Sequence, residues 1–208
     1  MKKVLLFSIL ICMCSCSEKI FKEKWTTQKA PEYFKARFET TQGNFDIEAK
    51  RAWSPEGVDR LHQLIESGFY TDIAIFRVVP NFVVQFGIHN DSILNNSWSQ
   101  YKINDEPVIE KNYKGSISFA RGGARSRTIQ IFINLKDNNR LDTYKGGGAT
   151  GFPVIAKVTK GMENIGKFYE AYGDKLGFKQ DSIQKYGNDF IKRKYPEIDF
   201  IQKAYIIK

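Results

Sequence analysis

Apolar and polar residues alternate along the chain from Phe34 onward, and this pattern predicts a protein built mainly from β-strands. Phe34, Ala36 and Phe38 are separated by charged residues, as expected for a strand that buries one face. A turn at residues 42–44 and a second alternating run, Phe45 to Ala49, complete a predicted β-hairpin. The further predicted strands are Ala74 to Val79, Phe82 to Phe86, Ser116 to Ala120, Thr128 to Asn134, Gly151 to Val158 and Gln202 to Ile207.

Two other segments follow the period of an amphipathic helix. The first runs from Pro55 to Gly68, with Ser54 as the expected N-cap and proline at the first helical position. His62 falls between the apolar positions of this helix and is expected to face the solvent. The second helix is expected over Lys160 to Ala171. Several short strands with two helices indicate a closed antiparallel barrel capped by helices.

The C-terminal part of the chain interrupts this pattern before the last strand. Residues 173–199 are interpreted as an insertion, and Asp181 to Lys194 within it could form a helix. No internal repeat is present, so we predict a single domain over residues 34–208.

The first sixteen residues have the features of an export signal. Lys2 and Lys3 precede the apolar run Val4 to Met13, which is shorter than the about 20 residues that a membrane-spanning helix needs. The stretch from Met13 to Cys16 resembles a bacterial lipobox, in which the last cysteine receives lipid. Cys16 fits this position because the small Ser15 precedes it.

These features predict three parts at the N-terminus. Residues 1–15 are a predicted signal peptide, Cys16 is the predicted lipid attachment site, and residues 16–33 are a predicted tether. The implied location is the bacterial cell envelope, either facing the periplasm or at the outer membrane. The alternative is an ordinary secretory signal with incidental cysteines.

Composition and charge narrow the possible functions further. The chain has 208 residues, of which 42% are hydrophobic and 26% charged, as in an ordinary globular domain. The net charge of +9 becomes +7 without Lys2 and Lys3, and the basic residues are scattered, so no nucleic-acid partner is expected. All three cysteines lie within the first sixteen residues, which excludes a disulfide framework or a thiol nucleophile in the domain.

Three motifs in unbroken order resemble those of the cyclophilin family of peptidyl-prolyl isomerases. They are FRVVPNFVVQFG at residues 76–87, GSISFARGGARSRTIQIFINL at residues 115–135 and AKVTKGM at residues 156–162. The similarity extends from about Phe38 to Phe168. It implies a closed, eight-stranded antiparallel β-barrel capped by two helices, here with a C-terminal helical insertion before the last strand.

The activity implied by this resemblance follows from the chemistry of the peptide bond. Resonance opposes rotation with a barrier of about 18–20 kcal/mol. Bonds that precede proline have similar cis and trans energies, yet they interconvert only over tens to hundreds of seconds. A catalyst needs an apolar slot for the proline ring, a cation directed at the prolyl nitrogen and a donor for the moving carbonyl group. It needs no nucleophile, cofactor or metal.

Matching motif positions assigns the site residues of this chain. Arg77 is the implied cation, and Gln85 and Phe132 complete the implied catalytic set. Gln85 would hold a substrate carbonyl, and Arg121 would contact the substrate through its main chain. The residues implied in substrate binding are Phe82, Val83, Ala120, Arg121, Gln130, Leu141 and Phe152.

Some positions depart from the family pattern. Val83 replaces a methionine, Phe86 replaces a glycine and Arg140 replaces a tryptophan. These changes favour an alternative, a module of cyclophilin fold that binds proline-containing segments but turns them over poorly. The retained catalytic set favours the enzyme. The expected function is therefore a monomeric envelope isomerase that helps exported, proline-containing polypeptides to fold.

Overall fold

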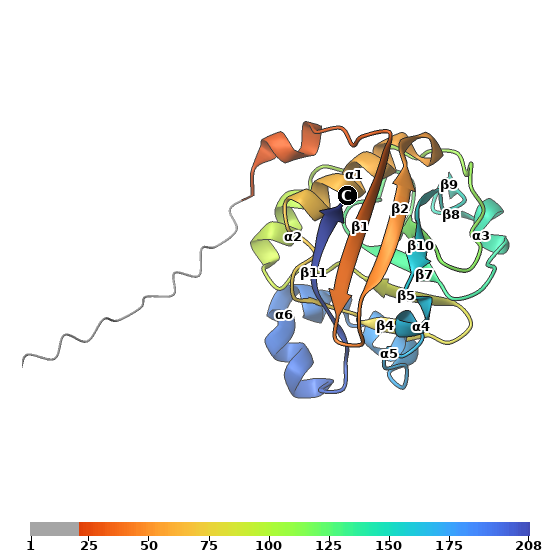
Figure 1. The fold of residues 1–208 in the computed structure, drawn as a ribbon. Helices are drawn as coiled ribbons and strands as arrows, with labels where there is room; N and C mark the ends of the chain where they lie inside the picture. The colour runs from red at the N-terminus through yellow and green to blue at the C-terminus, as the bar shows by residue number, and fades with distance from the viewer. Residues whose placement is uncertain (1–20) are drawn as a thin grey trace, which may run out of the picture.

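The computed structural model describes residues 21–208 as a curled β-sheet with helices around it (Figure 1). The predicted signal peptide, residues 1–15, and the predicted lipid site at Cys16 lie outside the described residues. Within residues 21–208, no helix is both long enough and apolar enough to cross a membrane.

Nine strands of the described chain form the main sheet, in the spatial order β3-β11-β1-β2-β10-β6-β7-β5-β4, and all neighbouring strands are antiparallel. Each segment predicted as a strand thus overlaps at least one strand of this sheet. The bounds of the strands are β1 Tyr33–Thr40, β2 Phe45–Lys50, β3 Ile73–Ala74, β4 Arg77–Val79, β5 Val83–Phe86, β6 Ser116–Phe119, β7 Ile131–Asn134, β10 Val154–Lys160 and β11 Phe200–Ile207. A separate ribbon pairs β8 (Lys145–Gly146) with β9 (Ala149–Thr150).

The sheet is an open half-barrel, so the expectation of a closed eight-stranded barrel is wrong. A closed barrel needs hydrogen bonds between its first and last strands. Here β3 pairs with β11 and β4 pairs with β5, and the two edge strands do not pair with each other. Both come from the single strand expected over Ala74 to Val79. Between them, the Ile75 N–H still donates to the Asp199 carbonyl beside β11, and Phe76 is buried in an apolar cluster with residues of the C-terminal insertion.

Helix α1 (Pro55–Glu66) confirms the first predicted helix and packs against β10 and β11. Its cap differs from the expectation, because Ser54 makes no side-chain bond to the helix and donates instead to the carboxylate of Glu106. That carboxylate accepts the backbone N–H groups of Glu56 and Gly57 at 2.8 and 3.1 Å. A negative group also suits the positive end of the helix dipole. Glu106 is therefore the residue that caps α1.

The second expected helix is much shorter than its pattern suggests. Helix α4 (Met162–Ile165) makes one turn, and the chain leaves the helical path at Gly166 instead of continuing to Ala171. Glycine is a weak helix former. The turn that follows lets the Tyr169 N–H donate to the Asp199 carboxylate at 2.7 Å.

The structure also contains helices that the pattern does not predict. Helix α2 (Ser92–Ser99) begins after Asp91, whose carboxylate accepts the backbone N–H groups of Ile93 and Leu94. The others within residues 21–208 are short: η1 (Glu23–Thr27), η2 (Arg51–Trp53), α3 (Arg140–Thr143) and α5 (Gly173–Gly177).

The C-terminal insertion folds as α5 (Gly173–Gly177) and α6 (Gln180–Lys194), and α5 packs against β4. The predicted helix over Asp181 to Lys194 is confirmed, with a break at Gly187. Its φ is 59°, and a Cβ there would collide with Asn90. An apolar cluster joins the insertion to the sheet, and its buried members are Ala74, Phe76, Ile88, Leu176, Ile183, Ile191 and Ile198.

The described part of the predicted tether, residues 21–33, packs against the domain. Phe21 and Trp25 both contact the ring of Trp98 in α2, with centroid distances of 5.3 and 6.3 Å. Because both rings pack on a residue of the domain, the folded unit begins before the expected boundary at Phe34.

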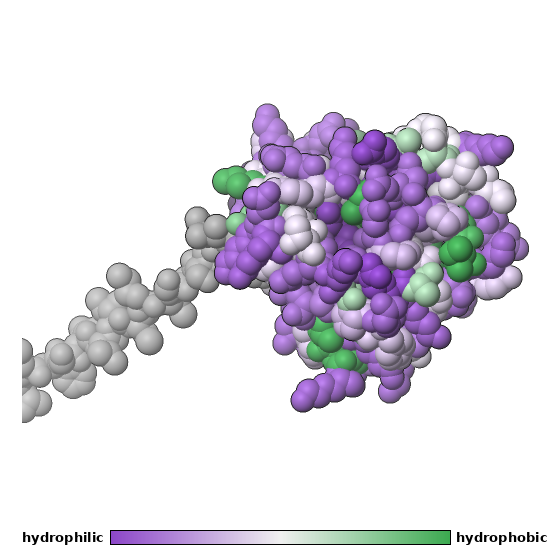
Figure 2. Space-filling model, turned by 90° about the horizontal axis from the view of Figure 1, so that it is seen from above, coloured by the Kyte–Doolittle hydropathy of each residue, from purple (hydrophilic) through white to green (hydrophobic). Residues whose placement is uncertain are grey.

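The main core fills the space between the curled sheet and α1 and is rich in aromatic rings. Phe38 stacks on Phe45 with their centroids 4.9 Å apart, and Phe86 meets Phe38 edge-on. The face of the molecule in Figure 2 is mainly hydrophilic, and its apolar residues are scattered. The apolar side chains of the strands are thus mostly used for folding.

His62 is half-buried in α1, which corrects the expectation that it faces the solvent. Its ring packs edge-on against Phe34 with a centroid distance of 5.0 Å. Burial lowers the pKa of His62 from its ordinary value of 6.5. The folded protein therefore favours the neutral imidazole.

This burial predicts a loss of stability in mild acid. The unfolded chain takes up a proton at His62 near pH 6.5 and the folded chain only at a lower pH, so the free energy of unfolding should fall as the pH drops through 6.5. Urea midpoints measured between about pH 7.5 and 5.5 test this. His62→Leu should show a smaller fall than the wild type. An equal fall in both proteins would contradict the assignment.

Candidate active site

Three neighbouring strands place Arg77, Gln85 and Phe132 in one row. Arg77 of β4 lies opposite Gln85 of β5, and Gln85 lies opposite Phe132 of β7. Opposite residues on antiparallel strands point to the same face of the sheet. The alternate residues Val84 and Phe86 point into the main core. The sheet itself therefore gathers the implied catalytic set on the face away from the core.

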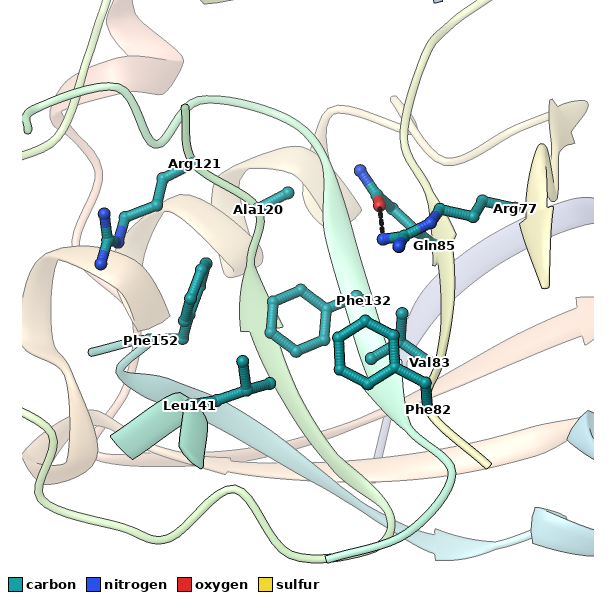
Figure 3. Close-up of a pocket in the computed structure, with 9 residues that line it drawn as sticks. All are labelled: Arg77, Phe82, Val83, Gln85, Ala120, Arg121, Phe132, Leu141 and Phe152. Carbon is teal, nitrogen blue, oxygen red and sulfur yellow. Dashed lines mark hydrogen bonds between the residues drawn. The ribbon is translucent and has the colours of Figure 1, made fainter. Parts of the chain in front are cut away.

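A pocket of about 180 Å³ lies on this face. In Figure 3, Phe132 occupies its centre, with other apolar side chains around the ring and with Arg77 and Gln85 along one side. Val83, Phe132 and Leu141 are buried and form a small cluster of their own. The pocket is lined by Arg77, Phe82, Val83, Gln85, Ala120, Arg121, Phe132, Leu141 and Phe152.

Arg77 is held at the edge of this pocket by two hydrogen bonds. Its Nε donates to Asp174 Oδ1 at 2.6 Å, and its Nη1 donates to Gln85 Oε1 at 3.0 Å. The guanidinium carbon lies 5.5 Å from the centroid of the Phe82 ring. Gly177 lets α5 come close, since a Cβ there would lie 3.2 Å from Arg77 Cδ. Three of the five guanidinium donors are not used in these two bonds.

The hydrogen bonds continue from Gln85 across the site. Gln85 Nε2 donates to Gln130 Oε1 at 2.9 Å, and Gln130 Nε2 donates to Gln180 Oε1 at 2.9 Å. Gln130 thus lies beside the pocket, where it borders a second recess. The complete chain runs from Asp174 through Arg77, Gln85 and Gln130 to Gln180, and both of its ends belong to the insertion.

Arg121 uses its side chain to organise the far side of the pocket. The guanidinium donates to backbone carbonyl groups of the β8–β9 region and lies 4.6 Å over the ring of Phe152. Burial lowers the pKa of Arg121 from its ordinary value. Phe152 in turn meets Phe132 edge-on at 5.5 Å. The Arg121 side chain is thus used within the protein, and the expected contact of its main chain with a substrate stays a prediction.

The departures from the family pattern leave this arrangement intact. Phe86 is fully buried in the core and does not line the pocket. The Arg140 guanidinium carbon lies 4.7 Å from the centroid of the Phe82 ring, and Arg140 does not line the pocket. Val83 is 2% exposed and fills the base of the pocket.

The structure therefore brings all the implied site residues into one region, nine of them in the pocket lining and Gln130 one hydrogen bond away. Sequence reasoning missed Asp174 and Gln180, which touch Arg77 and Gln130. No local motif marks either residue, since Asp174 lies 97 positions from Arg77 in the chain.

Comparisons with known proteins identify the family of this chain. A family model described as cyclophilin type peptidyl-prolyl cis-trans isomerase/CLD matches residues 35–188. Peptidyl-prolyl cis-trans isomerase A of Dickeya dadantii is 32% identical over 139 residues, which cover 66% of this chain and 72% of that protein. Peptidyl-prolyl cis-trans isomerase B of Escherichia coli is 29% identical over 147 residues, covering 69% and 89%.

Solved structures share the fold at lower sequence similarity. A cyclophilin type isomerase of Cryptosporidium parvum matches with a TM-score of 0.59 and 16% identity, over 85% of this chain and 98% of that one. A structure of the same protein in the presence of the dipeptide Ala-Pro matches with a TM-score of 0.58. This chain belongs to the cyclophilin family of peptidyl-prolyl cis-trans isomerases.

Proposed function

We propose that this protein accelerates the cis–trans isomerisation of X–Pro bonds in polypeptide clients. The observation that carries the proposal is the Arg77 guanidinium at the edge of an apolar pocket, in one row with Gln85 and Phe132. Such a pocket suits the pyrrolidine ring. Bonds before proline are also the peptide bonds whose two isomers are close in energy.

The chemistry of the site accounts for catalysis without a covalent step. With the proline ring against Phe132, the guanidinium of Arg77 is directed at the prolyl nitrogen. As the bond twists, the nitrogen lone pair becomes localised and can accept a hydrogen bond, which weakens the C–N double-bond character. Arg77 thus interacts more strongly with the twisted state than with either planar isomer, as catalysis requires. Acceleration of exchange in a short proline peptide tests the activity.

A second function has an observation in its favour. Arg77 is already paired with Asp174, which offsets part of its charge, and Val83 is smaller than the methionine of the family motif. Both features favour a module that binds proline-containing segments and isomerises them slowly. The two functions differ in turnover, because the module binds a proline peptide without accelerating its exchange.

We propose further that the protein is a monomer anchored by lipid at Cys16 in the bacterial cell envelope. The export signal and the lipobox-like stretch before Cys16 support this location. In Figure 1, η1 lies near α2, away from α3, which carries the pocket residue Leu141. An anchor before η1 would thus leave the pocket accessible to exported clients. An isomerase needs no nucleotide, which suits a compartment without ATP.

The anchor is tested by metabolic labelling with an alkyne fatty acid in a bacterial host. We expect the wild type to be labelled and to enter the membrane fraction. Cys16→Ser should lose both properties, because the lipid is carried on the cysteine that follows the cleavage site. Cys14→Ser is the matched control and should still be labelled. Labelling that survives in Cys16→Ser would contradict the assignment.

A further inference from the structure

The C-terminal insertion adds a recess that continues the proline pocket. This recess of about 290 Å³ is lined by Arg77, Gln85, Asp174, Gly177, Phe178 and Gln180. Arg77 and Gln85 line both cavities. An extended peptide advances about 3.3–3.6 Å per residue. A client with its proline in the pocket therefore reaches the insertion within a few residues.

The segment that forms this wall is fixed at several points. Leu176 is fully buried in the apolar cluster that joins the insertion to the sheet. On either side of it, Asp174 is bonded to Arg77, and Gln180 is bonded to Gln130. The wall is thus attached both to the sheet and to the polar side chains of the site.

Phe178 stands out within this anchored segment. The residue is 84% exposed, more than any other large apolar residue within residues 21–208. An exposed aromatic ring beside a binding pocket offers apolar surface that a ligand can cover. Asp174 Oδ1 accepts from Arg77 and Gln180 Oε1 accepts from Gln130, so part of the polar lining is bonded within the site itself. Among the residues that line the recess, Phe178 is the aromatic one, and it supplies the apolar surface that a ligand side chain can cover.

We propose that Phe178 and this recess form a further client subsite, which takes an apolar and preferably aromatic side chain close to the proline. The substrate class rests on the proposed isomerase function. The subsite is continuous with the proline pocket through Arg77 and Gln85, so one extended client segment occupies both. Its effect is to favour clients that carry such a side chain at the matching distance from the proline.

A peptide scan with the full-length protein in detergent tests the subsite. The probes are alanine peptides with one central proline, in which a single phenylalanine occupies each position up to three residues from the proline. Exchange is followed by NMR. Phenylalanine at one of these positions should raise kcat/KM about three- to tenfold over the all-alanine peptide, which is the range expected for one aromatic contact. Phe178→Ala should bring this ratio close to one, whereas Tyr186→Ala, an exposed aromatic of α6 outside the recess, should retain it.

The outcomes separate this inference from the proposed function. If phenylalanine raises kcat/KM at none of the positions, or if the increase persists in Phe178→Ala, the subsite is wrong even though the isomerase activity stands. If the wild type accelerates no peptide, the isomerase function fails and the subsite is decided by peptide Kd values. The subsite is supported if one phenylalanine position lowers the Kd for the wild type and if Phe178→Ala abolishes this difference. Equal Kd values for all peptides overturn the subsite.

Discussion

Replacing Arg77 by alanine is expected to lower kcat/KM for a proline peptide about 100-fold or more. This is the usual cost of removing one preorganised donor that stabilises a transition state. The guanidinium sits at the edge of the pocket and does not form its apolar base, which consists of Val83, Phe132 and Leu141. The Kd of the peptide should therefore change little, and most of the loss should appear in kcat. Peptide exchange and a binding titration on the same variant measure the two effects.

Arg140 provides the matched control, because its guanidinium also contacts the Phe82 ring, at 4.7 Å against 5.5 Å for Arg77. Arg140→Ala should stay within about threefold of the wild type, since this cation does not line the pocket. Arg77→Lys keeps the charge but loses the planar fork that bonds Asp174 and Gln85, so it should recover only part of the rate. Equal losses for Arg77→Ala and Arg140→Ala would contradict a specific role for Arg77.

Replacing Arg127 by alanine is expected to lower the free energy of unfolding by about 3–5 kcal/mol, because it leaves a carboxylate without its buried partner. The Arg127 side chain is 1% exposed, and its Nη2 donates to Glu106 Oε2 at 3.0 Å. It also donates to the backbone carbonyl of Asn104. Glu106 in turn caps α1, so the substitution disturbs a buried charge and a helix N-terminus together.

Urea denaturation of the variant and of an exposed control measures this effect. The ion pair between Lys203 and Glu39 has an N–O distance of 3.4 Å, but the Lys203 side chain is 55% exposed. Lys203→Ala should therefore cost less than about 1 kcal/mol. A loss below about 1 kcal/mol for Arg127→Ala would show that the buried pair contributes no more than a surface pair.

Most of the fold could be predicted from local patterns. Alternation identified the strands because burial of one face imposes a period of two residues. The same period placed Val83 and Gln85 on one face, and the structure shows both lining the pocket. The break at Ile75 and Phe76 could not be predicted, because Phe76 packs with residues of an insertion that is distant in the chain. That break leaves the sheet open.

The positions in the candidate site were predictable through motif spacing, but its outer wall was not. Asp174 and Gln180 lie in a segment without a motif, on either side of Leu176, which packs this segment against the sheet. The N-terminal cap of α1 is likewise a contact that the local sequence does not predict. Ser54 fits the local rule, yet Glu106, 50 positions from Glu56, makes the bond. Long-range polar contacts of this kind leave no periodic signal in the sequence.

The measurement that tests the account most directly is the rate of cis–trans exchange in a short Ala-Pro peptide with the wild-type protein. Uncatalysed exchange takes about tens to hundreds of seconds. We expect the exchange rate to rise in proportion to the protein concentration. A folded protein that binds the peptide in its proline pocket and leaves the exchange rate unchanged would contradict the account and identify a binding module instead.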